Sequence, residues 1–236
     1  MAVDDLPMPV VNFLNVIGIK WPYINEDQVL EFSRLVREFG QAVKQTHEDA
    51  TAAIRGIAQD YSGAATAQLR SGWAELSARH VTEIVDGCEV LAVALEVAAG
   101  YIVAQKVEAV ATLVGMAAAF VADQAAAVAT AGLAEAAVPL IIEGAQKLVD
   151  SLVMDLQQYI IGKVMEEALK PLIAKVGHAL AGLDWSNAAP AGGGASQGFS
   201  LDEQLVRGHT RALREHAATV RSHAETFRSG VAALGF

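Results

Sequence analysis

Apolar residues recur at helical spacing along most of this chain, and this pattern constrains the fold more than any other feature. Between residues 29 and 57 they are separated by three, four or seven positions: Val29, Phe32, Leu35, Val36, Phe39, Val43, Ala50, Ile54 and Ile57. Such steps place one side of a helix against a core. Asn25 precedes the stretch as an N-cap, and Gln28 stands where a capping box has its second member. The spacing predicts a long amphipathic helix that begins just after Asn25.

A second helical pattern follows after a short turn. The first pattern stops near Asp60, and apolar residues at helical spacing resume at once and continue to about Ala134. Two such stretches joined by a few turn residues predict an αα-hairpin. From Cys88 onward the second stretch is apolar nearly all round, so a helix there is covered by neighbouring helices or by lipid. A further helical pattern runs over about 140–183, and Pro171 is expected to kink it or end it one residue earlier.

The composition favours closely packed helices over a sheet. Hydrophobic residues make up 53% of the 236 residues and aromatic residues only 6%, because Ala and Val are abundant. Ala is the best helix former, and small residues such as Gly87, Gly100, Gly115 and Gly132 let helices approach closely. The predicted fold class is all-α, with hairpins of long helices packed as an elongated bundle.

The C-terminal region contains a clear internal repeat. Residues 207–234 divide into four heptads in which apolar residues recur at every seventh position: Leu213, Val220, Phe227 and Leu234. Small or apolar residues lie between them and complete a three-four pattern typical of a coiled coil: Thr210, Ala217, Ala224 and Val231. Ser200 and Glu203 form a capping box at the start. The pattern predicts a C-terminal amphipathic helix that binds a partner through the seam of Leu213, Val220, Phe227 and Leu234.

Three histidines also recur at every seventh position of this tail, namely His209, His216 and His223. Seven residues are two helical turns, or about 10.5 Å, which is too far for two of them to share a metal ion. We interpret them as residues that flank the seam. A pH switch, in which they gain charge below about pH 6.5 and loosen the seam, is the alternative.

The chain divides into three regions by composition. Residues 186–198 carry no charge and no apolar periodicity, which is typical of a flexible linker. We therefore predict a helical bundle domain over 1–185, a linker over 186–199 and an amphipathic helix over 200–236. The last region has five Arg and four acidic residues, which is a net charge of +1. Because the whole chain has a net charge of −10, residues 1–199 have a net charge of −11. The tail is expected to dock on the acidic body or on a partner.

Several classes of function are disfavoured by the sequence. A net charge of −10 argues against nucleic acid as a partner and gives no attraction to an anionic membrane. Cys88 is the single cysteine, so no intrachain disulfide is possible, and its apolar surroundings predict a buried, inert thiol. The chain has no nucleophile elbow, dinucleotide fingerprint or zinc-protease spacing. We expect a protein that is not an enzyme, with no catalytic residue, metal or cofactor.

The hydrophobic segments indicate neither a signal peptide nor a clear membrane span. Met8–Ile19 is apolar, but acidic residues precede it and Trp21-Pro22 follows where small residues are expected. The longest charge-free run in the hydrophobic middle, Ala109–Ala122, has 14 residues, fewer than the roughly 18 that a span requires. We predict buried helix here. Insertion of the helices in 88–161 as a membrane channel remains an alternative, although their charges make it costly.

The segment Tyr61-Ser62-Gly63-Ala64-Ala65-Thr66-Ala67-Gln68-Leu69-Arg70-Ser71-Gly72-Trp73 resembles the turn of the WXG (Trp-x-Gly) family. These are helical hairpins exported by type VII (ESX) secretion systems. Tyr61 stands at the place of the family's Trp and Gly63 at that of its Gly, and Trp73 follows as an aromatic. The entry turn at Trp21-Pro22 looks like the start of a longer actinobacterial variant, which forms the N-terminal domain of channel-forming and polymorphic toxins. The resemblance covers 1–185.

This resemblance implies a non-enzymatic delivery module that leaves the cytoplasm without a signal peptide. Its implied partners are the type VII machinery and another helical WXG-type protein, or a second copy of itself. The family's export tag, Tyr-x-x-x-Asp/Glu after the second hairpin helix, is not found where expected, so a partner is a candidate carrier. Either a cargo domain lies beyond residue 236 or the chain is an adaptor whose tail helix pairs with another protein. A structural homo-oligomer built through the tail is a further alternative.

Overall fold

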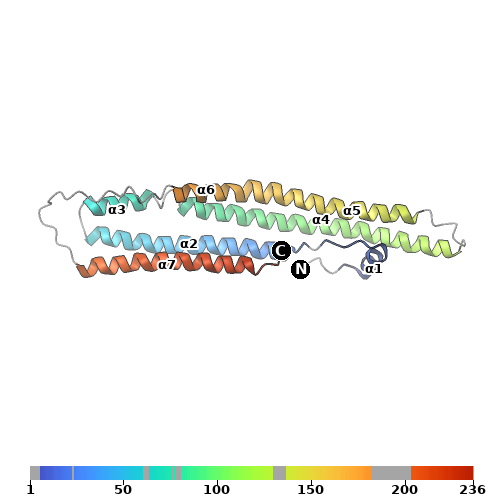
Figure 1. Cartoon of the computed structure of the whole chain (residues 1–236), viewed down its shortest axis with the longest axis horizontal. Coiled ribbons are helices and arrows are strands. Elements are labelled where there is room, and N and C mark those ends of the chain that lie inside the picture. The colour runs from blue at the N-terminus through green and yellow to red at the C-terminus, as the bar shows by residue number, and fades with distance from the viewer. Residues whose placement is uncertain are drawn as a thin grey trace. The chain divides into compact units, whose positions relative to one another are not determined.

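The structure, a computed structural model, describes residues 6–22, 24–60, 64–75, 77, 81–129, 137–181 and 203–235. In chain order the elements are α1 (Met8–Ile17), α2 (Glu26–Asp60), α3 (Ala64–Glu75), α4 (Thr82–Ala129), α5 (Val138–Tyr159), the π-helical segment η2 (Ile160–Leu169), α6 (Lys170–Ala181) and α7 (Glu203–Ala232) (Figure 1). These ranges contain long helices packed against one another and no strand, which confirms the predicted all-α class.

The start of α2 agrees with the predicted cap, but only half of the capping box forms. Asn25 Oδ1 accepts hydrogen bonds from the backbone N–H groups of Asp27 at 3.0 Å and Gln28 at 3.3 Å. Glu26 and Asp27 lie in the first turn, where the helix dipole favours negative charge. Gln28 Oε1 is buried and has no hydrogen-bond partner, so it does not reach back to the cap. The Asn25 side chain therefore satisfies the backbone N–H groups of Asp27 and Gln28 without the second member of the capping box.

The second arm of the hairpin is helical in its described residues, as the pattern predicted, but its geometry changes along the way. Between α3 and α4, the described residues Ser77 and Val81 are π-helical. Ser77 Oγ donates to the backbone carbonyl of Trp73 at 2.7 Å, and Thr82 Oγ1 donates to the carbonyl of Ser77 at 3.1 Å. Hydroxyl groups that bond nearby carbonyls compete with regular helical hydrogen bonds. These local bonds lie where the α-helical geometry changes.

The predicted third helical stretch is present from Val138 to Ala181, and it changes character near its proline. The chain passes from α5 through η2 to α6, which begins at Lys170, one residue before Pro171. Proline has no N–H group to donate, and its ring collides with the carbonyl four residues earlier in a regular α-helix. The wider π-helical turns before Pro171 relieve this conflict without ending the helix.

The chain forms two compact units. The first contains residues 1–31 and 94–166, and the second contains 32–93 and 167–235. The domain boundaries predicted from composition remain a prediction, and residues 186–199 lie outside the described part of the chain.

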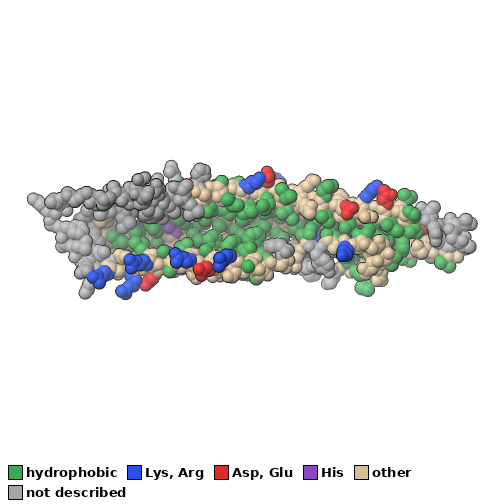
Figure 2. Space-filling view, in the orientation of Figure 1, with side chains coloured by type: hydrophobic (Ala, Val, Ile, Leu, Met, Phe, Trp, Pro, Cys, Tyr) green, Lys and Arg blue, Asp and Glu red, His purple; other side chains and the backbone are tan. Residues whose placement is uncertain are grey.

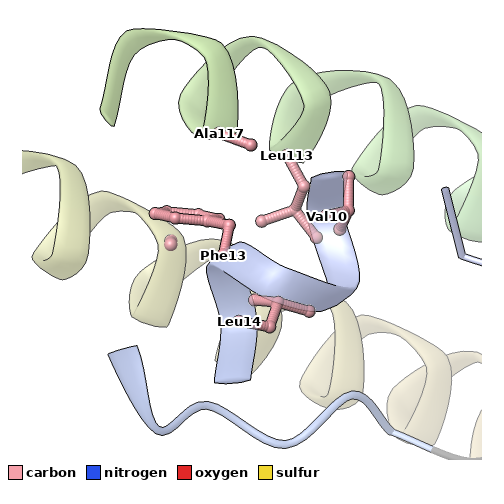
Figure 3. Packing of buried hydrophobic residues seen from close by; sticks show 6 residues of the cluster. Val10, Phe13, Leu14, Leu113 and Ala117 are labelled. Carbon is pink, nitrogen blue, oxygen red and sulfur yellow. The ribbon is translucent and has the colours of Figure 1, made fainter. Parts of the chain in front are cut away.

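In the first unit, α1 packs against the antiparallel pair of α4 and α5. Figure 3 shows the buried cluster that joins them, with side chains from three helices: Val10, Phe13, Leu14, Leu113, Ala117 and Ala145. The ring of Phe13 also lies against that of Phe120, with centroids 5.3 Å apart. Gly18 ends α1 with φ of 74°, a left-handed conformation that favours glycine. This turn returns Ile19 to the same cluster, so the N-terminal segment is part of the core.

In the second unit, α2 is packed between the first turns of α4 and the antiparallel helix α7 (Figure 1). Ser33 Oγ donates to the carbonyl of Ala92 at 2.9 Å. A Cβ atom built on Gly40 would lie 2.9 Å from Cys88 Cβ, so the two helices approach closely there. Cys88 is 4% exposed, and burial raises the pKa of its thiol to about 11. The predicted burial of this thiol is therefore confirmed.

The glycines predicted to permit close packing behave differently from one another. A Cβ on Gly87 would lie 2.5 Å from Leu172 Cδ1 of α6, so this glycine does allow a close approach. Gly100 and Gly115 meet nothing within 4 Å, so no contact within the described chain uses the space at them, and packing of a partner there stays a prediction. Both lie on an outer face of α4, where no described neighbour needs the space. Gly132 lies outside the described residues.

Candidate interaction surfaces

Trp73 joins α3 to α2. Its indole stacks on the His47 ring, with centroids 4.8 Å apart and planes 15° apart. Its Nε1 donates to Thr51 Oγ1 at 2.9 Å, and Thr51 Oγ1 donates in turn to the backbone carbonyl of His47 at 2.8 Å. An indole that is both stacked and hydrogen-bonded fixes the position of one helix on another. The predicted motif residues Tyr61 and Gly63 lie outside the described residues.

His47, whose ring stacks on Trp73, also forms a hydrogen bond with Ser77. Its Nε2 lies 2.7 Å from Ser77 Oγ, which already donates its only proton to the carbonyl of Trp73. Nε2 therefore carries the proton and donates to Ser77. Burial lowers the pKa of His47, and the carboxylate of Glu48 opposes this shift. The imidazole is held neutral as a packing and hydrogen-bonding group.

An open cavity of about 770 Å³ lies beside this contact. It is lined by residues of α2 and α3 that include Thr51, Ile54, Arg55, Arg70 and Trp73. Two guanidinium groups and no carboxylate are among its described lining residues, so it favours an anionic group. Elsewhere, no three His, Cys, Asp or Glu side chains are grouped to hold a metal ion within the described ranges.

The predicted entry turn lies against the first unit's core. Trp21 is partly buried against the α1 cluster, and its Nε1 is buried without a hydrogen-bond partner. Pro22 is half-buried beside it. The indole therefore contributes apolar contact area and leaves one donor unsatisfied, which costs free energy. The structure places Trp21 as a core residue of the entry segment.

A buried ion pair follows the entry turn, and sequence reasoning missed it. Lys106 of α4 is 0% exposed and Glu26 is 1% exposed. Lys106 Nζ donates to Glu26 Oε2 at 2.7 Å and also to the backbone carbonyl of Ile24. Lys106 is the only Lys or Arg between positions 80 and 146. A lone cation in an apolar helix requires a partner when it is buried, and that was the available signal.

The tail helix packs on α2, and its contact face includes the histidine positions. Phe227 lies against Phe39 with centroids 5.1 Å apart and against Phe32 at 6.4 Å. His223 Nε2 lies 3.0 Å from Thr46 Oγ1, so this histidine is in the contact and not merely beside it. Gly230, seven residues on, packs closely against Leu35. Phe227 lies one helical turn from both His223 and Gly230. The side of α7 that carries the histidine positions is therefore the side that packs on α2.

The predicted seam is therefore only partly covered within the chain. Leu213, Phe227 and Leu234 are half-buried, whereas Val220 is 39% exposed. The side chain of His209 lies outside the described residues. Figure 2 shows Arg side chains in a row along α7. Binding of a partner by Leu213, Val220, Phe227 and Leu234 stays a prediction.

The length and apolar composition of α4 are relevant to membrane association. By length and composition alone, Thr82–Ala126 of α4 is long and apolar enough to cross a membrane. A helix in the core of a water-soluble protein passes the same test. One side of this helix is indeed core, as Leu113 and Ala117 show.

Comparison with known proteins identifies the family. The family model for the WXG100 like domain matches residues 4–143, which is more than half of the chain and runs from α1 into α5. The matched region contains the Tyr61–Trp73 segment and the entry turn that suggested a WXG-type protein. Searches of curated proteins and of solved structures found no match. The chain belongs to the WXG100-like family, and this places it among helical proteins associated with type VII secretion.

Proposed function

We propose that this chain is a non-enzymatic delivery and interaction module of a type VII secretion substrate, either the N-terminal targeting region of a toxin-like protein or its adaptor. The observation that carries the proposal is the family match over residues 4–143, which spans the helical hairpin. The module leaves the cytoplasm by a route that needs no signal peptide. Its action is recognition of one helix surface by another, with no chemical step.

The polar side chains of the hairpin support this proposal because they are engaged in holding helices together. His47, Thr51, Trp73 and Ser77 bond to one another or to nearby carbonyls. A hydrolytic site would need an activated nucleophile next to a base with a free path to substrate. Here the Ser77 proton is directed to the carbonyl of Trp73, and the His47 nitrogen nearest to Ser77 is a donor. The arrangement favours a rigid hairpin end over catalysis.

The rigid end of the hairpin is the surface through which we propose that the export motor recognises the module. An export motor must distinguish a folded helical substrate from other cytoplasmic proteins, so the recognised surface has to keep one shape. Trp73 fixes α3 on α2 through a stacked ring and a hydrogen bond. The adjacent cavity with Arg55 and Arg70 presents positive charge to an acidic partner segment.

The test is export of the tagged chain by its native host, with and without an active type VII motor ATPase. The proposal predicts that the chain appears in the medium only when the motor is active. Trp73→Ala should reduce export while the protein stays soluble, and Val90→Ala, a small apolar change at an exposed position on α4, serves as the control. Retention of the intact, soluble wild-type chain in both strains would overturn the proposal.

A further inference from the structure

The short helix α1 covers an apolar part of α4 and α5 in the first unit. Val10, Phe13 and Leu14 are at most 4% exposed and stand at positions i, i+3 and i+4, so they form one face of α1. Figure 3 shows this face packed against the longer helices. We call the surface beneath it the covered surface, which consists of Leu113, Ala117 and Ala145. The covered surface therefore binds an apolar helix face, and α1 occupies it.

Helix propensity alone cannot keep α1 in place. It has ten residues, and isolated helices of this length are not stable in water. Met8 and Val16 on its outer side are 67% and 71% exposed, so α1 packs on one side only. Gly18 ends the helix in a left-handed turn. The position of α1 therefore depends on its one packed face and on the attachment of the entry segment, residues 18–28, that follows it.

The entry segment is attached to α4 through buried polar groups. Lys106 Nζ donates to Glu26 Oε2 at 2.7 Å and also to the backbone carbonyl of Ile24. The two charged side chains are only 1% and 2% exposed. A buried ion pair often stabilises a fold no more than apolar residues of the same size, whereas loss of one partner is strongly destabilising. The attachment therefore depends on both charges and can be released at a single residue.

Two buried polar atoms of the same segment have no hydrogen-bond partner. They are Trp21 Nε1 and Gln28 Oε1, and among the described residues one further buried side-chain atom, Asp123 Oδ2, shares this state. A buried donor or acceptor without a partner costs free energy, which it regains when water reaches it. Release of the entry segment would expose both atoms to water. These two atoms therefore favour an open state and oppose the apolar contacts that keep α1 closed.

We propose that α1 and the entry segment open together, and that the covered surface then binds an amphipathic helix of a partner protein. The partner helix carries apolar residues at positions i, i+3 and i+4, because α1 fits the covered surface with that spacing. In the free chain, α1 acts as an internal competitor that keeps this surface closed. A partner helix binds by taking the place of α1.

This inference deepens the proposed function and rests on it, since it names a surface and a kind of partner for a module that recognises helices. The purified full chain is enough to test it, without a secretion system. A chain that never opens therefore leaves the export result standing, and failure of export leaves the opening of α1 standing.

The first experiment measures opening by the reaction of Ala145→Cys with a water-soluble thiol reagent. Ala145 is 0% exposed and belongs to the cluster that α1 covers. The native Cys88 is buried in the second unit and reports unfolding there. Each rate is divided by the rate of the same thiol in urea. The corrected rate at position 145 should exceed that of Cys88 by about tenfold or more, because opening of α1 needs less free energy than unfolding.

The second experiment changes the attachment in the Ala145→Cys chain. Glu26→Leu leaves the buried Lys106 without its carboxylate when α1 is closed, whereas water solvates the ammonium when it is open. The rate at position 145 should rise about a hundredfold or more. Glu26→Leu with Lys106→Met removes both charges and should return the rate to the wild-type value or below. Glu108→Leu makes the same exchange at an exposed position of α4 and should leave the rate unchanged.

The third experiment tests docking with a fluorescent synthetic peptide of residues 6–19, which carries the apolar face of α1 and a charged tail for solubility. Only the open chain can bind the peptide, so the apparent affinity is proportional to the open fraction while that fraction is small. Glu26→Leu should therefore raise the affinity by the same factor as the reaction rate at position 145. A peptide with Phe13→Asp and Leu14→Asp is the control and should not bind.

A further variant keeps the test decisive if Glu26→Leu does not fold. Gln28→Met replaces the buried acceptor with an apolar side chain of similar length and should lower the rate at position 145 about threefold or more. An unchanged rate in this variant would contradict the proposal, as would equal corrected rates at position 145 and Cys88. Equal binding of the two peptides would also overturn it. Binding of phospholipid vesicles by Glu26→Leu without binding of the peptide would show that the occupant is lipid and would overturn it as well.

Discussion

The outer faces of α4 and α7 differ although both helices pack one side against their own unit. The outer face of α7 carries charged, exposed side chains, among them Arg214, Arg221 and Glu225. The outer face of α4 carries exposed apolar side chains, among them Val97, Val114 and Val128. Water solvates the charged face of α7 well, whereas exposure of the apolar face of α4 to water is unfavourable in proportion to its area. The comparison teaches that a heptad pattern in the sequence does not by itself reveal which side of a helix is left apolar and exposed.

The α7 heptads were plain in the sequence, yet they mark a helix that docks on its own chain. The exposed apolar side of α4 was hidden in the sequence, because α4 is apolar on nearly every side and the pattern lacks polar contrast. Only burial separates the two apolar sides of α4. The side with Ile102 and Leu113 is core, and the side with Val107 and Val114 is exposed.

The largest expected effect comes from breaking the Lys106–Glu26 ion pair on the buried side of α4. Glu26→Leu leaves the buried Lys106 ammonium without its carboxylate and should lower the free energy of unfolding by about 3–5 kcal/mol. The double variant Glu26→Leu with Lys106→Met removes both charges and should recover most of the loss. Urea denaturation measures both. Equal losses for the single and double variants would show that the pairing is not what stabilises this site.

A smaller effect is expected from Gly40, where α2 and α4 approach in the second unit. Gly40→Ala places a Cβ 2.9 Å from Cys88 Cβ, and neither atom can move away without shifting a helix. The substitution should cost about 1–3 kcal/mol of stability. Gly100→Ala is the matched control on the outer face of α4, where nothing lies within 4 Å, and should stabilise its helix by up to about 1 kcal/mol. Thermal unfolding of both variants checks the opposite signs.

A packed and an exposed side chain can also be compared on α7 itself. Phe227→Ala removes a ring that packs on Phe32 and Phe39, and should cost about 1–2 kcal/mol because the ring is only half-buried. Val220→Ala, at an exposed position on the same helix, should change stability by less than about 0.5 kcal/mol. Denaturation curves compare the two. Equal small effects would mean that α7 does not depend on this aromatic contact.

The smallest effect concerns pH and His47. Burial lowers the pKa of this histidine from 6.5, so the unfolded chain binds a proton more readily than the folded chain. The contribution of His47 is therefore fully present above pH 6.5 and is lost as the pH falls from 6.5 through the lower folded value. Glu48 opposes the shift, and Arg55 and Arg70 line the same cavity.

The test compares stability at pH 7.5 and pH 5 for the wild type and His47→Asn. The wild type should lose more stability on acidification than the variant does. Gln41→Asn, which exchanges one uncharged amide for another at an exposed position of α2, is the control and should retain the wild-type pH dependence. A pH dependence that is the same with and without His47 would contradict the assignment.

Local features of the fold were predictable from the sequence. The Asn25 cap, the end of α2 at Asp60 and the helical stretch to Ala181 each depend on residues near one another in the chain. The WXG resemblance rested on short motifs, and the family match confirms it. Burial of Cys88 followed from its apolar neighbours.

Features that depend on distant residues were not predictable. Glu26 and Lys106 are 80 positions apart, and no local pattern links them. The contact of His223 with Thr46 joins residues 177 positions apart and depends on the rotation of α7 against α2. In each case tertiary packing determined the outcome.

The central claim is that one side of α4 is core and that its outer face is apolar but exposed. The most direct measurement is the reaction rate of single introduced cysteines with a water-soluble thiol reagent, at Ile102, Leu113 and Ala117 on the core side and at Val107, Val114 and Val121 on the outer face. Cys88 contributes no background, because it is buried and its pKa is about 11. The account predicts slow reaction at the three core positions, fast reaction at the three outer positions, and equal rates once urea unfolds the chain. Equal rates on the two sides of α4 in the native protein would contradict it.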